Sequence, residues 1–116
     1  MNHKALVALG SNLSVDGRPP IAVLQDAVAR LKEFVSAQGG GNYVLSTFYQ
    51  TPAFPEGSGP DFVNAALSFD WPEGPNPLLA QLHAIEADFG RNRMMRWAAR
   101  GLDLDLIGLG DLILPS

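Results

Sequence analysis

The sequence contains no cysteine. This absence excludes disulfide bonds, thiolate zinc sites, iron–sulfur clusters and cysteine nucleophiles, so a bound metal must be held by oxygen or imidazole ligands. The sequence also has no apolar run near the roughly 18 residues that a membrane span needs. The apolar stretch that ends at Leu9 is shorter than most signal sequences and precedes no cleavage pattern. We therefore expect a cytoplasmic protein that does not bind a membrane.

Positive charge is scarce and unevenly distributed. Eight basic residues stand against twelve acidic ones, and the net charge is −4. This balance argues against nucleic-acid binding over the whole surface. Four of the eight basic residues are arginines within residues 91–100. The sequence thus combines an acidic body with one arginine cluster.

The length and composition predict one globular domain covering residues 1–116. A chain of 116 residues forms a modest core, and two domains would be crowded. Its apolar fraction of 47% and charged fraction of 17% are those of a folded chain rather than a disordered one. We expect this domain to be a monomer.

Hydrophobic periodicity predicts four strands and two helices in the order β-α-β-β-α-β, followed by a short final strand or edge. Prolines begin both helices, with Asn76 as the N-cap and Pro77 as the first residue of the second, which Gly90 ends. This order is typical of an α+β, ferredoxin-like fold, an antiparallel sheet with two helices on one face. The four strands are predicted at 4–9, 43–50, 62–71 and 102–107, residues 108–114 as a turn leading into the short final strand or edge, and the helices at 21–35 and 77–89.

Two aspartates share one face of the strand predicted after residue 101. Side chains alternate along a strand, so Asp103 and Asp105 lie opposite the neighbouring leucines. Two carboxylates there can converge on one or two hard cations, and Mg²⁺ is commonly held by carboxylates together with substrate phosphates. The alternative is an edge strand that displays acids for solubility.

The arginine cluster precedes this strand directly. Guanidinium groups suit phosphate oxygens, although a solvated loop paired with surface acids is the alternative. Together the two features predict a magnesium–nucleotide site for phosphoryl transfer. The cluster consists of Arg91, Arg93, Arg96 and Arg100, with Trp97 among them to stack on a ring or to anchor the loop.

A long proline- and glycine-rich loop at residues 51–61 is a second candidate region. Phe54 and Phe62 flank it, and Asn64 shares a strand face with Phe62. Two rings and one carboxamide can form a slot for a flat heterocycle. Alternatively, Phe62 belongs to the core and Asn64 caps a backbone group. The run Gly10-Ser11-Asn12 matches no known phosphate-binding pattern.

Five segments of the sequence resemble one family, the 6-hydroxymethyl-7,8-dihydropterin pyrophosphokinases of folate biosynthesis. Their order and spacing agree over essentially the whole chain, and the segment from Arg96 to Asp105 is the most specific. The segments are LVALGSNL (6–13), STFYQTPAF (46–54), PDFVNAAL (60–67), IEADFGRNR (85–93) and RWAARGLDLDLIGLG (96–110).

This resemblance implies transfer of pyrophosphate from ATP to the pterin hydroxymethyl group, with release of AMP. It implies that Asp103 and Asp105 bind two Mg²⁺ ions and that Arg91 and Arg100 contact the phosphates. It assigns the nucleotide site to Glu86, Arg93, Arg96, Trp97 and Leu106, and the pterin pocket to Thr51, Pro52, Phe54, Phe62 and Asn64.

The chain departs from the family pattern in two ways. Ala98, Ala99 and Gly101 replace a glycine, a proline and a hydroxyl residue, which predicts a less constrained loop. Family members also continue past the position of Ser116, so we expect either a fragment or a shortened relative. The alternatives are a catalytically impaired pterin- or nucleotide-binding relative, an RNA-binding domain, which the acidic balance disfavours, and a regulatory domain.

Overall fold

The computed structural model describes residues 2–12, 15, 17–52, 57, 60–89 and 101–113. Its elements follow the predicted order, with one predicted strand divided into two. They are β1 (His3–Ser11), α1 (Pro20–Ala37), β2 (Gly41–Leu45), β3 (Tyr49–Thr51), β4 (Phe62–Trp71), α2 (Pro75–Asp88), β5 (Asp103–Leu109) and β6 (Leu112–Ile113).

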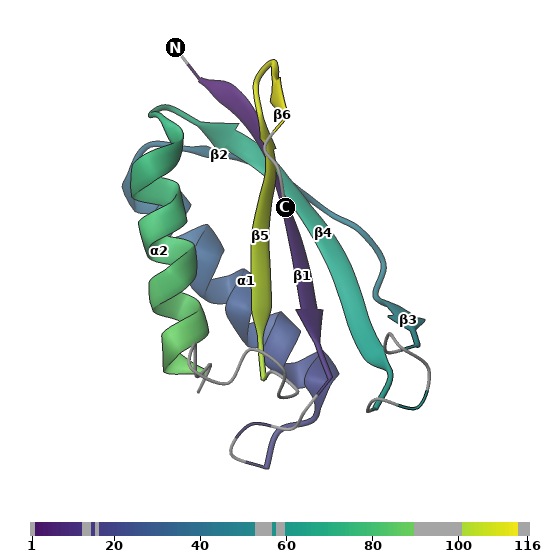
Figure 1. The fold of residues 1–116 in the computed structure, drawn as a ribbon. Coiled ribbons are helices and arrows are strands. Elements are labelled where there is room, and N and C mark those ends of the chain that lie inside the picture. Colours follow the sequence, from purple (N-terminus) through teal and green to yellow (C-terminus); the bar gives the residue numbers. More distant parts are fainter. Residues whose placement is uncertain are drawn as a thin grey trace.

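The strands form one sheet in the order β2-β4-β1-β5-β6, and β3 pairs with the same strand as β2, namely β4. Every pairing between these strands is antiparallel. Both helices lie on one side of the sheet, and the other side is left open by the described residues (Figure 1). The predicted α+β, ferredoxin-like class is therefore confirmed.

The core lies between the helices and one face of the sheet. On β1 the alternate residues Ala5, Val7 and Leu9 are buried there, whereas Lys4 and Leu6 are exposed. On α1 the buried residues recur at helical spacing, which is the stripe that the sequence predicts. Burying each large aliphatic side chain contributes about 1.5–3 kcal/mol, so this face holds the sheet and helices together.

Glycine allows the chain to turn closely from α1 into β2. Gly39 has φ +94°, in the left-handed region that favours glycine. A Cβ atom added at Gly40 would lie 2.3 Å from the carbonyl oxygen of Asp70. The first helix therefore ends just before these glycines, because of close backbone approach as well as conformational freedom.

The predicted strand at 43–50 is interrupted between β2 and β3. The amide of Ser46 donates to the carbonyl oxygen of Ala66, but the amide of Ala66 donates to the Ser46 hydroxyl, at 2.8 Å in each case. A side-chain oxygen therefore replaces the backbone acceptor of the ladder. This local competition separates the two short strands.

The second helix begins two residues earlier than predicted. Pro75 is its first residue and Gly74 its N-cap, so the prediction of Asn76 as N-cap is wrong. The indole Nε1 of Trp71 donates to the carbonyl oxygen of Gly74 at 2.8 Å, which fixes the chain just before the helix. Within the described residues, no helix is long and apolar enough to cross a membrane.

Candidate active site

A pocket of about 230 Å³ lies on the open face of the sheet, where the end of β1 meets the beginnings of β4 and β5. It brings both predicted metal-binding aspartates together with three of the residues predicted to bind the heterocycle. Its lining residues are Ala8, Leu9, Gly10, Thr51, Phe62, Asn64, Asp103 and Asp105.

Strand register explains this assembly. Gly10 on the central strand pairs with Asn64 on one side and with Asp103 on the other. Two residues back along the same strand, Ala8 pairs with Asp105. Because neighbouring strands lie about 4.8 Å apart, residues separated by more than 35 positions in sequence share one small area. Small side chains at the centre leave room for a ligand between the flanking polar groups.

Asp103 and Asp105 occupy the same face of β5, as the alternation predicts. Asp103 is half-buried and Asp105 is exposed, whereas Leu104 and Leu106 are each 4% exposed on the opposite face. Alternate residues of a strand lie about 7 Å apart at their Cα atoms, a spacing that lets two carboxylates reach one cation or hold two.

The donor set of this pocket fits Mg²⁺ bound together with phosphates. Carboxylate oxygens are the ligands this hard cation prefers. Within the part of the chain that the structure describes, no group of three or more His, Cys, Asp or Glu side chains is arranged to hold a metal. A cation at the two aspartates would therefore take further ligands from phosphate or water, as Mg²⁺ usually does.

Asn64 and Phe62 form the opposite wall of the pocket. The Nδ2 of Asn64 donates to the Thr51 hydroxyl at 2.8 Å, so its carboxamide bonds a side chain rather than capping the backbone. A Cβ atom added at Gly10 would lie 3.2 Å from the Oδ1 of Asn64 and 3.6 Å from the Phe62 ring. Phe62 is half-buried and stands outside the main core cluster. Pro52 is exposed directly after β3.

Glu86 and Leu106, both assigned to the nucleotide site by the resemblance, have buried side chains outside this pocket. Glu86 is 1% exposed, and its Oε2 accepts a hydrogen bond from the amide of Leu104 at 2.8 Å. Glu86 is therefore not a solvated surface residue of α2. Leu106 belongs to the core cluster between the sheet and the helices.

Two further polar residues follow Gly10 of the pocket directly in the chain and were not predicted as site residues. Ser11 is fully buried and donates through Oγ to the carbonyl oxygen of Gly101 at 2.5 Å. Asn12 is 5% exposed, and its Nδ2 donates to the carbonyl oxygen of Pro60 at 3.3 Å. The sequence signal for them is the polar run Gly10-Ser11-Asn12 at the end of a buried strand, which matches no known phosphate-binding pattern.

Six predicted site residues lie outside the described part of the chain. They are Phe54, Arg91, Arg93, Arg96, Trp97 and Arg100.

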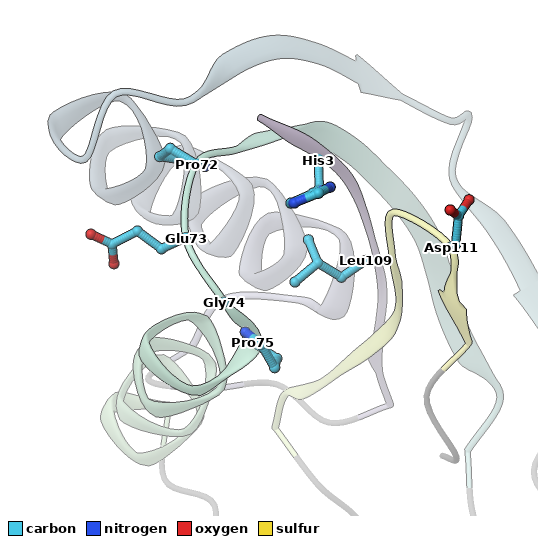
Figure 2. A pocket seen from close by; sticks show the side chains of 7 residues that line it. All are labelled: His3, Pro72, Glu73, Gly74, Pro75, Leu109 and Asp111. Atoms are coloured by element: carbon cyan, nitrogen blue, oxygen red, sulfur yellow. The ribbon is translucent and has the colours of Figure 1, made fainter. Parts of the chain in front are cut away.

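A larger pocket of about 450 Å³ lies at the other end of the sheet, lined in part by His3, Glu73, Pro75, Leu109 and Asp111 (Figure 2). In Figure 2 the carboxylates of Glu73 and Asp111 point away from each other, so the polar groups do not converge. Convergence of polar groups, rather than volume, distinguishes the smaller pocket as the candidate site.

Comparison with known proteins agrees with the geometry. Residues 6–116 match the model of the 7,8-dihydro-6-hydroxymethylpterin-pyrophosphokinase family. Three similar proteins carry the name 2-amino-4-hydroxy-6-hydroxymethyldihydropteridine pyrophosphokinase. The one from Synechocystis is 38% identical over 94% of this chain and 52% of its own length. The one from Pseudomonas aeruginosa is 36% identical over 98% and 66%, and that from Pseudomonas putida 33% identical over 100% and 90%.

The chain thus spans about half to two thirds of the length of the first two relatives. The family match covers nearly all of the chain and includes every described residue of the pocket. The chain belongs to the 7,8-dihydro-6-hydroxymethylpterin-pyrophosphokinase family.

Proposed function

We propose that this protein transfers the pyrophosphoryl group of ATP to the hydroxymethyl oxygen of 6-hydroxymethyl-7,8-dihydropterin. The observation that carries the proposal is the pocket that joins Asp103 and Asp105 to Phe62 and Asn64. A metal–phosphate site and a slot for a flat heterocycle must adjoin in such an enzyme, since the acceptor oxygen has to reach the nucleotide phosphates. The names of the relatives support the same substrate.

The reaction forms one bond and breaks one. The acceptor oxygen bonds to the β-phosphorus of ATP, the bond from that phosphorus to the oxygen shared with the α-phosphate breaks, and AMP leaves. The hydroxyl proton passes to the surrounding water. Positioning and charge neutralisation dominate catalysis of such transfers.

Asp103 and Asp105 would hold two Mg²⁺ ions in this reaction. Bound there, the ions would supply positive charge to the phosphate oxygens. The half-buried position of Asp103 lowers its contact with water, whereas Asp105, which also lines the pocket, is exposed.

The Asn64 carboxamide would recognise the edge of the pterin ring. Its Nδ2 is bonded to Thr51, which directs Oδ1 toward Gly10 inside the pocket. This oxygen can accept a hydrogen bond from a ring N–H or amino group. The half-buried Phe62 ring offers an aromatic surface beside it.

The arginine cluster would bind the phosphates of ATP. Arg91 and Arg100 are proposed to contact them, with Arg93, Arg96 and Trp97 completing the nucleotide site. The support is sequence proximity, because Arg100 lies only three positions before Asp103. Phe54 and Pro52 would border the pterin. We further propose that the protein acts as a monomer in the cytoplasm.

The test is release of AMP from ATP, Mg²⁺ and 6-hydroxymethyl-7,8-dihydropterin by the 116-residue chain. Asp105→Ala serves as the blank, and Asp111→Ala is a matched control because Asp111 is also exposed but lines the distant pocket. We expect AMP release by the wild type and Asp111→Ala only. Undiminished binding of both substrates without AMP release would instead identify a catalytically impaired binding relative.

A further inference from the structure

We infer that Glu86 and Ser11 are positioning residues that hold the backbone on either side of Asp103 from the helix-covered side of the sheet. The inference rests on the proposed metal-binding role of Asp103. It assigns Glu86 a role in the interior of the protein, different from the nucleotide contact that the resemblance implies.

Glu86 reaches β5 from α2. It is 1% exposed and follows the buried residues Leu82 and Ile85 on that helix. Its Oε2 accepts the amide of Leu104 at 2.8 Å, and Leu104 is the residue between the two aspartates. Glu86 therefore fixes the strand at the point where both aspartates emerge.

The outer edge of β5 explains the need for this contact. Among the described residues, only Gly108 and Leu109 have a strand partner on that side, which is β6. On the other side, β1 pairs with Asp103, Leu104 and Asp105. The side chain of Glu86 thus provides a hydrogen-bond acceptor for the outer edge of β5 at Leu104, where no strand among the described residues pairs with that edge.

Ser11 fixes the other side of Asp103. Its buried Oγ donates to the carbonyl oxygen of Gly101 at 2.5 Å. Gly101 is itself closely packed, since an added Cβ would lie 2.5 Å from Cγ2 of Val15 and 2.7 Å from the carbonyl oxygen of Phe89. The chain entering β5 has little room to move. The rest of the loop for which less constraint is predicted, including Ala98 and Ala99, lies outside the described residues.

Two buried polar side chains therefore bond the backbone two residues before Asp103 and one residue after it. Burying a carboxylate is costly, and an apolar side chain of similar size would fill the same space at lower cost. The chain instead uses Glu86 where a displacement of about 1 Å at a catalytic group can change rates about 100-fold. Because their hydrogen bonds lie on either side of Asp103 in the chain, we assign Glu86 and Ser11 to the positioning of Asp103.

The inference is tested by Mn²⁺ binding, followed by electron paramagnetic resonance in the presence of a non-hydrolysable ATP analogue. Glu86→Leu removes the acceptor at similar volume, and Glu86→Gln keeps an acceptor oxygen without the charge. Glu33→Gln on α1 is the control for loss of an exposed carboxylate. We expect Glu86→Leu to weaken Mn²⁺ binding about tenfold or more, whereas Glu86→Gln and Glu33→Gln stay within about threefold of the wild type.

Nucleotide affinity measured without metal separates positioning from direct contact. We expect it to be unchanged in both Glu86 variants. Equal loss of nucleotide affinity in Glu86→Gln and Glu86→Leu would overturn the inference in favour of a direct contact, and unchanged Mn²⁺ binding in Glu86→Leu would overturn it outright. If Glu86→Leu does not fold, Ser11→Ala is judged by the same two measurements. Absence of Mn²⁺ binding in the wild type would refute the proposed function as well. Failure of the positioning inference alone would leave Mn²⁺ binding by the wild type intact, so the two outcomes are distinguishable.

Discussion

Replacing Gly10 by alanine should weaken pterin binding while leaving the fold intact. Gly10 is the central residue of the pocket and pairs with both Asn64 and Asp103. The added methyl group would lie 3.2 Å from the Oδ1 of Asn64, which is tighter than most such contacts, so the carboxamide must move by a few tenths of an ångström. That movement strains the 2.8 Å hydrogen bond from Asn64 to Thr51.

The expected loss of pterin affinity follows from the single hydrogen bond between Asn64 and Thr51. A net contribution of about 0.5–1.5 kcal/mol corresponds to about a 2- to 12-fold increase in the dissociation constant for the pterin. Stability should change by less than about 1 kcal/mol. Alanine restricts the unfolded chain and so stabilises by about 0.4–1 kcal/mol, which offsets the crowded contact.

The assay is isothermal titration with 6-hydroxymethyl-7,8-dihydropterin in the presence of Mg²⁺ and an ATP analogue, together with urea unfolding. Gly41→Ala is the matched control, because no described atom lies within 4 Å of a Cβ added at Gly41. Pterin affinity equal to wild type in Gly10→Ala would refute the reasoning, since it would mean that the Asn64 carboxamide does not contact the ligand.

Three further predictions concern the aspartates and one glycine. Asp103→Ala and Asp105→Ala should abolish metal-dependent AMP release but keep a wild-type circular dichroism spectrum, because both side chains lie on the open face; unfolding of either variant would contradict this placement. The Lys4 ammonium, 2.7 Å away, and a further hydrogen bond lower the pKa of Asp70, so its contribution to stability is complete above the ordinary carboxyl pKa and is lost as pH falls through the lowered value. Wild type should therefore lose more stability than Asp70→Asn in urea titrations from about pH 5 to about pH 3, and equal losses would argue against the sign. Gly40→Ala should lower the unfolding temperature, because its Cβ would lie 2.3 Å from the carbonyl oxygen of Asp70; an unchanged temperature would show that the turn relaxes freely.

The sequence by itself determined the order of elements and the face on which the aspartates lie. These features depend on local periodicity. Leucines alternate with Asp103 and Asp105, and apolar residues recur at helical spacing in α1, so neighbours along the chain are sufficient to predict them. Proline and glycine likewise mark the start and the end of α1 through their own backbone preferences.

Only the tertiary structure decided which residues meet. The pairing of Gly10 with Asn64 and Asp103 is set by strand register, which local sequence does not encode. Glu86 has the same local pattern as a surface residue of a helix, yet helix packing buries it against the amide of Leu104. Contacts made across long sequence separations arise from packing of whole elements, and this is why the pocket became visible only in the folded chain.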